Sequence, residues 1–368
     1  MKIVIFGLSV SSSWGNGHAM LLRGLFRALH ELGHEVHFFE RDAPHYARWR
    51  DAPALPYAHL HLYRDWESAL PEMKTALADA EAGMVTSYCA DGIAACNLVL
   101  GSKLPRTAFY DMDTGVTLSR LERHEPIPYL PPQGLSGFDL VLSYTGGRAL
   151  DLLHELLGAR CVATLYGWVD PAIHYRVEPS HWYEADLSYL GTYSIDRQAA
   201  VEALFLTPAR RLSNRQFVIG GPMYPDTETW PKNVRHYHHV GPPEHCAFYS
   251  SCPLTLNVTR ADMAALGYCP SGRFFEAAAV GTAVLSDWWE GLDTFFQPGE
   301  EILLASSAAD AIAAVQTDRS ALAEIARRAR ERTLDCHTAE IRARRLVSLF
   351  ENPVDEASVA APCALGEA

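Results

Sequence analysis

Short apolar runs alternate with amphipathic helical patterns along the first half of the chain. The strand candidates read KIVIFGL, EVHFFE, HLHLY, MVTSYC, RTAFYDMD, DLVLSYT and CVATLY. Helical patterns lie between them, at residues 18–32, 66–80, 92–100 and 148–157. Near-continuous apolar strands separated by helices are typical of a parallel sheet covered on both faces. The pattern predicts a Rossmann-like domain over residues 1–168.

The pattern breaks at GWVDPAIHYRVEPSHWYEA, which is rich in Pro, Trp and charge, and then restarts. The second set of strand candidates reads DLSYLGTYS, RQFVIGG, VRHYHHV, PLTLNVT, TAVLSD and EILLAS. Helical patterns follow at residues 197–206, 245–250, 273–280 and 308–315, and two longer ones, at 321–333 and 338–351, close this part. We expect a second Rossmann-like domain over residues 169–352 and a mobile tail over residues 353–368.

Two doubly wound sheets predict an α/β protein whose two domains face each other across a cleft. In such sheets, ligands bind at the carboxyl ends of the strands. The polar motifs described below all fall at such strand ends, so we expect them to line the cleft.

Composition narrows the classes of partner. The formal charge of −13 comes without a long basic run, which argues against nucleic acid and anionic membrane as partners. No apolar run approaches the roughly 20 residues that span a bilayer. Eight cysteines occur without a Cys-x-x-Cys pair, so we expect reduced thiols and a cytoplasmic location. The sequence does not indicate an oligomeric state.

The segment PSGRFFEAAAVG predicts a short helix with an anion site at its start. Ser271 is a plausible N-cap, Gly272 and Arg273 lie in the first turn, and Gly281 is a plausible stop. Free N–H groups and an Arg suit a diphosphate. Glu276, one turn later, could accept hydrogen bonds from a ribose diol. Phosphate and ribose together indicate a nucleotide. The alternative is a capped core helix in which Glu276 pairs with Arg273.

The stretch SSSWGNGHA follows the first predicted strand and suits an acceptor. Gly15 and Gly17 let a ligand approach the backbone, with Asn16 between them. His18 could be a general base for an acceptor hydroxyl, because histidine is the side chain that ordinarily exchanges a proton near neutral pH. It could equally be a cap or packing residue fixed by Asn16.

In YDMDTGVT, Asp111 and Asp113 are expected on one face of a strand end by the two-residue alternation. A D-x-D pair could hold a metal ion. We favour a role in contacting the acceptor or fixing the loop, and we expect no metal.

The stretch VRHYHHVGPPEHC invites a zinc hypothesis. It carries His236, His238, His239, His245 and Cys246. His236 and His238 share a strand face while His239 points away, so the alternation disfavours convergence on one ion.

Two further groups follow strand ends in the second half. Arg260 is expected either to contact phosphate or to pair with Asp287. Trp288 and Trp289 could form a wall against a sugar ring, but packing is the simpler expectation.

The segment GYCPSGRFFEAAAVGTAVLSDWWEGLDTFFQPGEEIL resembles the donor-nucleotide motif of group 1 glycosyltransferases, which are GT4-like and have the two-domain GT-B fold. More narrowly, it resembles the CgeB-like spore-maturation branch. Supporting stretches are SSSWGNGHAMLLRGLFRAL, FFERD, FYDMDTGVTLSRL, DLVLSYTGGRALDLL, LYGWVDP and DLSYLGTYSIDRQ. Together they span most of residues 1–305.

The resemblance implies roles for individual residues. Glu276 matches the family's ribose-binding Glu, and a second Glu, eight residues earlier, is Tyr268 here. Gly191 and Arg197 match a strand end and a cationic position that meet the donor diphosphate. Val240, followed by Gly241, matches the loop that holds the nucleobase.

The resemblance thus implies transfer of a sugar from a nucleotide-diphosphate donor to an acceptor hydroxyl, without cofactor or metal. Arg197, Arg273 and the helix at Ser271 would stabilise the departing diphosphate. The donor-site likeness favours retention of anomeric configuration. Two rivals are a nucleotide-sugar 2-epimerase on the same fold and a non-catalytic sugar-nucleotide-binding protein of envelope or spore assembly.

Overall fold

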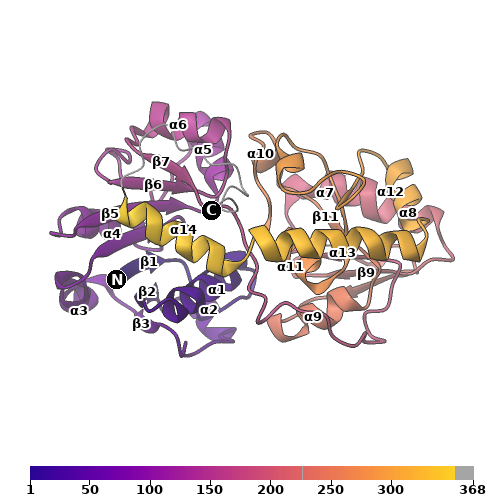
Figure 1. Ribbon diagram of the computed structural model, residues 1–368, viewed down its shortest axis with the longest axis horizontal. Coiled ribbons are helices and arrows are strands. Elements are labelled where there is room, and N and C mark those ends of the chain that lie inside the picture. The colour runs from indigo at the N-terminus through magenta and orange to yellow at the C-terminus, as the bar shows by residue number, and fades with distance from the viewer. Residues whose placement is uncertain (226, 353–368) are drawn as a thin grey trace. The chain divides into compact units, whose positions relative to one another are not determined.

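The computed structural model describes residues 1–225 and 227–352, which form two compact units (Figure 1). The first unit comprises Met1–Tyr166, Leu266–Cys269 and the described residues from Ala339 onward. The second comprises Gly167–Ala265 and Pro270–Thr338. The predicted tail, residues 353–368, lies outside the described residues.

The first unit is a parallel seven-stranded sheet with helices on it. Its strands are β1 (Lys2–Gly7), β2 (Glu35–Arg41), β3 (His59–Tyr63), β4 (Ala82–Thr86), β5 (Arg106–Asp111), β6 (Leu140–Ser143) and β7 (Val162–Thr164). Its helices are α1 (Gly17–Glu31), α2 (Pro44–Arg48), α3 (Trp66–Ala78), α4 (Gly92–Leu100), α5 (Thr114–Glu122), α6 (Arg148–Leu157) and α14 (Ala339–Glu351). Phe6, Phe39 and Phe109 are fully buried in its core, as near-continuous apolar strands require.

The second unit repeats this plan with a parallel six-stranded sheet. Its strands are β8 (Leu187–Leu190), β9 (Phe217–Gly220), β10 (Val234–Tyr237), β11 (Leu254–Asn257), β12 (Ala283–Ser286) and β13 (Leu303–Leu304). Its helices are α7 (Ile195–Val201), which continues through a π-helical turn (Glu202–Leu206) into α8 (Thr207–Arg211), then α9 (Pro242–Ser250), α10 (Ala261–Ala264), α11 (Gly272–Val280), α12 (Ala308–Val315) and α13 (Arg319–Cys336). Short 3₁₀ turns lie at Thr227–Thr229 and Leu292–Thr294.

The two sheets have the same strand order. The first runs β3-β2-β1-β4-β5-β6-β7 and the second β10-β9-β8-β11-β12-β13. The first strand of each unit, β1 or β8, lies inside its sheet. The direction in which successive strands are added reverses next to it, between β1 and β4 in the first unit and between β8 and β11 in the second. Loops at such a reversal leave a crevice where ligands bind. The predicted α/β fold with two Rossmann-like domains is therefore confirmed.

The last helix differs from the predicted domain boundary. The predicted C-terminal domain, residues 169–352, included α14, whereas this helix packs on α1 in the first unit (Figure 1). Ala343, Leu346 and Phe350 form its buried face, and Arg106 Nε donates to the Phe350 carbonyl at 2.9 Å. An amphipathic pattern predicts that one face of a helix is buried, but not which sheet buries it. Among the described residues, no helix is both long and apolar enough to cross a membrane.

Candidate functional site

The loop after β1 is held in one conformation by Asn16. Its carboxamide oxygen accepts from the backbone N–H of His18 at 3.1 Å, which caps α1. Its side-chain nitrogen donates to the carbonyls of Ser9 and Ser12 at 2.9 and 3.1 Å. Gly15 has φ of +61°, a conformation that favours glycine. The predicted loop is therefore a braced turn that presents His18 at the start of the helix.

A buried carboxylate, Glu40 of β2, fixes the base of the same loop. It accepts from Ser9 Oγ at 2.7 Å, from the N–H groups of Val10 and Ser11 at 2.7 and 2.9 Å, and from Ser11 Oγ at 2.5 Å. Four donors satisfy a charge that burial would otherwise penalise strongly. The sequence analysis missed this role, although a Glu within the apolar run EVHFFE was a signal for it.

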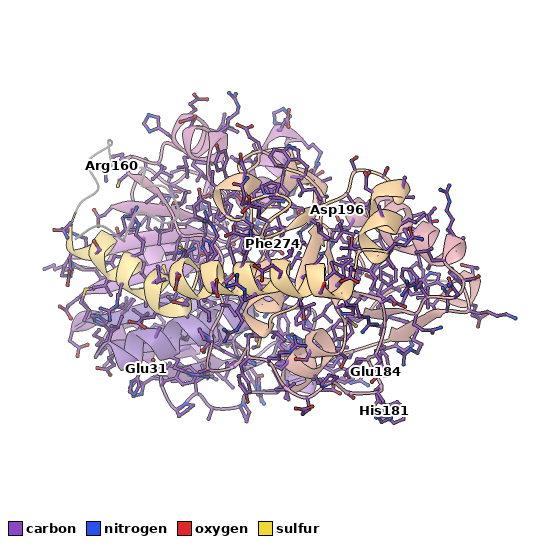
Figure 2. The ribbon with its side chains drawn as sticks, turned by 45° about the vertical axis from the view of Figure 1, so that its right-hand side comes forward. Glu31, Arg160, His181, Glu184, Asp196 and Phe274 are labelled. Atoms are coloured by element: carbon purple, nitrogen blue, oxygen red, sulfur yellow. The ribbon has the colours of Figure 1, made fainter. Side chains whose placement is uncertain are left out.

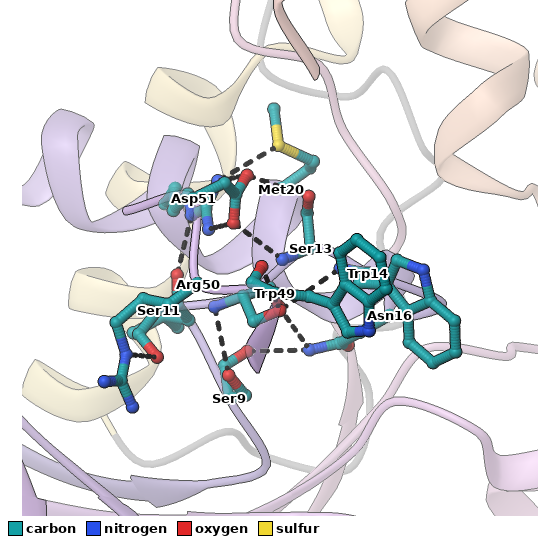
Figure 3. A network of polar contacts seen from close by, with 12 residues as sticks. Ser9, Ser11, Ser13, Trp14, Asn16, Met20, Trp49, Arg50 and Asp51 are labelled. Carbon is teal, nitrogen blue, oxygen red and sulfur yellow. Dashed lines mark hydrogen bonds and ion pairs between the residues drawn. The ribbon is translucent and has the colours of Figure 1, made fainter. Parts of the chain in front are cut away.

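A second set of contacts braces the outer part of the loop (Figure 3). Arg23 of α1 forms a bidentate pair with Asp51, with N–O distances of 3.0 and 2.8 Å, and Asp51 also accepts from Ser13. The rings of Trp14 and Trp49 stack, with centroids 5.7 Å apart. The loop is thus tied to the segment that follows β2.

His18 and Asp113 form a close pair in the first unit. His18 Nε2 lies 2.6 Å from Asp113 Oδ2, and Asp113 stands at the start of α5. Among the described residues, His18 Nδ1 is buried without a hydrogen-bond partner. A carboxylate that orients an imidazole by accepting from one nitrogen leaves the second nitrogen able to accept a proton.

Asp111 is not the neighbour of Asp113 on a shared strand face. That prediction was wrong because β5 ends at Asp111, which is fully buried, while Asp113 begins a helix. One Asp111 oxygen accepts from the Asp113 N–H at 3.1 Å and the other has no partner among the described residues. Burial raises the pKa of Asp111 to about 7. The two carboxylates belong to no metal-competent cluster in the described chain.

In the second unit, the end of β8 meets the start of α11. A Cβ at Gly191 would lie 2.9 Å from Tyr189 Oη and 3.4 Å from Arg273 Nη2, so glycine permits this close approach. The Arg273 guanidinium lies over the Tyr189 ring, 5.8 Å from its centroid. The structure thus brings together two residues, Gly191 and Arg273, that the sequence analysis chose separately.

Several polar atoms around this point have no partner within the described chain. They are Nε of Arg197 and the hydroxyls of Tyr189 and Tyr249, both fully buried. Arg197 also donates through Nη2 to the Thr192 carbonyl at 2.8 Å. Each unpaired buried polar group costs roughly 1–3 kcal/mol, which a ligand with oxygen acceptors could recover.

Ser271 stands at the N-cap of α11, but its side chain does not cap the helix. Its hydroxyl donates instead to Asn257 Oδ1 at 2.8 Å, at the end of β11. The predicted N-cap position is therefore correct, but the Ser271 hydroxyl forms no capping hydrogen bond with the first N–H groups of the helix, from Gly272 on. The predicted stop is correct, since Gly281 ends α11 with φ of +83°.

Glu276 of α11 faces two histidines. Its Oε1 lies 3.9 Å from His174 Nε2 and its Oε2 lies 4.0 Å from His245 Nδ1. Among the described residues, the Glu276 carboxylate contacts these two rings and forms no ion pair with Arg273. Burial lowers the pKa of His174 to about 4 and also lowers the pKa of His245, so both rings are neutral near pH 7. Sequence reasoning missed His174, which lies in the segment that breaks the periodicity.

The loop after β10 holds Val240 and Gly241 as predicted for a strand end. Val240 is buried, and Gly241 is the N-cap residue of α9, with its N–H 3.4 Å from Glu244 Oε2. The proposed zinc group of this stretch does not form among the described residues. His236 Nε2 instead bonds to the Gly221 carbonyl at 2.9 Å, and only His245 of that set lies in a metal-competent cluster.

Arg260 pairs with Asp196, at 3.1 Å, and not with Asp287 (Asp196 is labelled in Figure 2). Asp287 accepts from Thr259, from its N–H at 3.0 Å and from its hydroxyl at 3.1 Å. Of the two alternatives predicted for Arg260, the pair with Asp287 is not among the contacts of the described residues, because the turn after β11 satisfies Asp287 locally, while contact with phosphate stays a prediction.

The packing expectation holds for one of the two tryptophans. Trp289 is buried, with its ring centroid 6.1 Å from that of Phe274 (labelled in Figure 2) and 5.8 Å from that of Phe295. Trp288 is 53% exposed and remains available to a ligand or partner.

Tyr268, at the position where the resemblance would lead one to expect a Glu, packs in the first unit. Its carbonyl accepts from the Gly146 N–H at 3.0 Å, and a Cβ at Gly147 would lie 2.6 Å from its ring. Its own φ of +45° is unusual for a tyrosine. The side chain thus has a local packing role.

A family model described as "Glycosyl transferase-like" matches residues 197–348. The match includes α11 and both arginines that were predicted to meet a diphosphate. Among curated protein sequences, none matches the chain significantly. This part of the chain is therefore a glycosyltransferase family domain.

Solved structures of glycosyltransferases align with nearly the whole chain. Sucrose-phosphate synthase from Thermosynechococcus elongatus is 15% identical over 95% of this chain and 98% of its own, with a TM-score of 0.68. Alr3699/HepE from Anabaena, solved with UDP and glucose, is 11% identical over 95% and 99%, with a TM-score of 0.67. An alpha-glucosyltransferase solved with UDP and DNA is 12% identical over 96% and 99%, with a TM-score of 0.71. These likenesses establish the GT-B fold.

Proposed function

We propose that this chain, with its glycosyltransferase family domain, transfers a sugar from a UDP-linked donor to the hydroxyl of an acceptor. UDP is chosen because HepE and the alpha-glucosyltransferase were solved with it. The acceptor we propose is a small molecule, since a formal charge of −13 disfavours a nucleic acid. The proposal includes membership of the CgeB-like branch and a cytoplasmic location. The expectation of reduced thiols holds for described cysteines such as Cys89 and Cys252, but it was wrong for Cys336, which is disulfide-bonded.

The observation that carries the proposal is the set of unpaired polar groups around Arg273. A diphosphate there would accept hydrogen bonds from Arg273, Arg197 Nε and the start of α11, and from the buried hydroxyls of Tyr189 and Tyr249. Charge-assisted bonds of this kind strengthen as the leaving diphosphate gains charge, so they favour the transition state.

The nucleoside would extend from the diphosphate along the second unit. Glu276 would accept from the ribose hydroxyls, with His174 and His245 beside its carboxylate. The backbone of Val240 and Gly241 would meet the base. These assignments carry over the roles that the family resemblance implies.

On the first unit, we assign His18 as the base that takes the acceptor proton, oriented by Asp113. The 2.6 Å contact and the unpartnered Nδ1 support this role. The loop of Gly15, Asn16 and Gly17 would position the acceptor. A side-chain base on the acceptor favours a single displacement with inversion at the anomeric carbon.

Retention is the second candidate. It is favoured by the resemblance of α11 to a retaining family, in which the departing phosphate takes the acceptor proton. In that case the His18–Asp113 pair would only position the acceptor. The anomeric coupling in the proton NMR spectrum of the first product distinguishes the two.

The scheme needs no metal, because Arg197, Arg273 and the start of α11 offset the diphosphate charge. We therefore expect activity to persist in EDTA. Loss of turnover in EDTA that a divalent ion restores would contradict this part of the proposal.

Calorimetric titration with UDP tests the donor site. Arg273→Ala and Glu276→Gln should each weaken UDP binding by about 10- to 100-fold, since a hydrogen bond to a charged group contributes roughly 1.5–3 kcal/mol. Arg327→Ala, which removes an exposed ion pair on α13, is the control and should leave UDP affinity unchanged. Equal affinity in all four proteins would overturn the donor assignment.

Product analysis separates the alternatives. Incubation with the donor alone should yield no epimer at the sugar C2, and an acceptor screen should yield a glycosylated product. An epimer formed without acceptor would establish a 2-epimerase instead. UDP-sugar binding without turnover over every acceptor would indicate a non-catalytic binding protein.

A further inference from the structure

His174, His245 and Glu276 form a compact cluster of metal-ligating atoms in the second unit. One ligand atom from each residue lies within 4.8 Å of the other two. They come from distant parts of the chain, namely the segment before β8, helix α9 and helix α11. Two imidazole nitrogens and one carboxylate oxygen are a common ligand set for zinc.

The ring nitrogens of the two histidines that point into this cluster form no hydrogen bonds with the described residues. His174 is 97% buried by side-chain area, with an exposed fraction of 3%, and neither ring nitrogen has a hydrogen-bond partner. His245 Nδ1 is also buried and unpartnered. A neutral imidazole buried in this way lacks a partner for its lone pair, which is the electron pair that a metal ion takes.

The orientation of His245 is fixed from its other side. Its Nε2 lies 3.3 Å from the Val240 carbonyl, which can only accept, so Nε2 carries the proton and donates it. Nδ1 therefore presents its lone pair toward Glu276. A backbone carbonyl that holds the second nitrogen of a ligand histidine is a typical outer-shell contact of zinc sites.

From this geometry we propose that His174 Nε2, His245 Nδ1 and Glu276 bind one Zn²⁺ ion. Zinc bonds of about 2.0–2.1 Å place tetrahedral ligand atoms roughly 3.4 Å apart. His174 lies 3.9 Å from one Glu276 oxygen and His245 lies 4.0 Å from the other, and single ligand atoms of the three residues lie within 4.8 Å of one another, so the separations would need to shorten by about 0.5–1.4 Å. Side-chain rotation over that distance is small, and a fourth position stays open for water.

The proposed site shares Glu276 with the proposed ribose contact, so this consequence rests on the proposed function. A carboxylate bound to zinc no longer offers both oxygens to a diol. Zinc should therefore lower the affinity for UDP, and a chelator should restore it. The ion would thus inhibit donor binding and take no part in transfer, which is consistent with the activity that we expect in EDTA.

The test is titration of the full chain with Zn²⁺ in the absence of nucleotide. A second cluster on the surface, made of Glu35, His37 and His59, could also take zinc, so every protein carries His59→Ala. We expect one equivalent of zinc to bind, and His174→Ala and His245→Ala each to weaken that binding at least tenfold. His239→Ala removes an exposed histidine near the site and should leave zinc binding unchanged.

Cobalt substitution gives a readout that does not depend on folding energies. Co²⁺ in the parent protein should show the visible absorption of a low-coordinate N/O site, and the band should vanish in the His174→Ala and His245→Ala proteins. Thermal unfolding of each variant checks that it is folded, and His245→Asn provides a second, milder change.

Three outcomes overturn the proposal: no stoichiometric zinc binding, binding that survives both histidine changes, or zinc binding that leaves UDP affinity unaltered. Its failure is distinguishable from failure of the proposed function. UDP binding in EDTA tests the donor site without zinc, and zinc binding without UDP tests the metal site alone.

Discussion

The two units share a strand order but differ near the point where that order reverses, because the first holds its loop with many hydrogen bonds, although His18 Nδ1 and one Asp111 oxygen lack a partner among the described residues. In the first unit, Glu40 accepts four hydrogen bonds from the loop after β1, and Asn16 and Asp51 tie down the rest of it. In the second unit, the buried hydroxyls of Tyr189 and Tyr249 have no partner within the described chain. The same topology therefore carries one braced loop and one set of unpaired groups.

This difference separates two kinds of site. A loop whose polar groups are already satisfied is rigid before any ligand arrives and can hold a base in position. Unpaired buried groups raise the free energy of the empty protein, and a ligand that pairs with them binds more tightly for that reason. We therefore expect changes in the first unit to affect turnover or local stability, and changes in the second to affect ligand affinity.

His18→Ala should have the largest effect. Loss of a general base lowers turnover by about 10²- to 10⁴-fold, while UDP affinity should stay unchanged because His18 belongs to the first unit. Steady-state kinetics and UDP calorimetry on the same preparation check both halves. A loss well below a hundredfold would favour retention, with the leaving phosphate as base.

Glu40→Gln should loosen the braced loop. The amide nitrogen of Gln would face N–H and O–H donors, so at least one buried bond is lost, at a cost of roughly 2–3 kcal/mol. Hydrogen exchange at the amides of Val10 and Ser11 should accelerate by at least tenfold. Glu31→Gln, at an exposed position of α1, is the control and should leave these rates unchanged. Unaltered exchange in the Glu40 variant would contradict the bracing role.

Asp111→Asn should change how stability depends on pH. The folded pKa of Asp111, about 7, lies above the unfolded value of about 3.9, so the folded state holds the proton more tightly. The contribution of Asp111 to the free energy of unfolding therefore falls as pH rises from about 4 to about 7 and is constant above that. The variant should lack this decline, which for pKa values of about 7 and about 3.9 amounts to at most about 4 kcal/mol, and its stability relative to the wild type should therefore rise between pH 4 and pH 8. Thermal unfolding of the wild type and of Asp111→Asn is measured at several pH values between about 4 and about 8. If the stabilities of the two proteins change in parallel over this range, the raised pKa of Asp111 is disproved.

Tyr249→Phe and Tyr110→Phe should have small effects of opposite sign. Both tyrosines are fully buried, but the Tyr110 hydroxyl donates to the Leu165 carbonyl at 2.7 Å, whereas that of Tyr249 has no partner in the described chain. Removing the unpaired hydroxyl should stabilise the empty protein by about 1 kcal/mol, and removing the paired one should destabilise it by a similar amount. Chemical denaturation without ligand measures both, and the same sign for both would break the comparison between the units.

Much of the fold could be read from the sequence, because apolar strands and amphipathic helices carry a local periodicity. Residues 92–100 and 148–157, for example, were predicted as helices and are α4 and α6. The helix α5, Thr114–Glu122, was not predicted, because its polar and small residues lack a clear apolar stripe. The helix α14 was predicted but assigned to the other domain, because its partner α1 lies at the far end of the chain.

The candidate site was also only partly predictable: the sequence identified its main residues but not their partners. The sequence by itself singled out Arg273, Glu276 and His18, since each is a chemically distinctive residue at a strand end or helix start. Only the tertiary structure decided their partners: Asp113 for His18, and His174 with His245 for Glu276. Residue type and local pattern are encoded within a few positions, whereas a hydrogen-bond partner depends on chain folding that brings distant segments within about 3–4 Å.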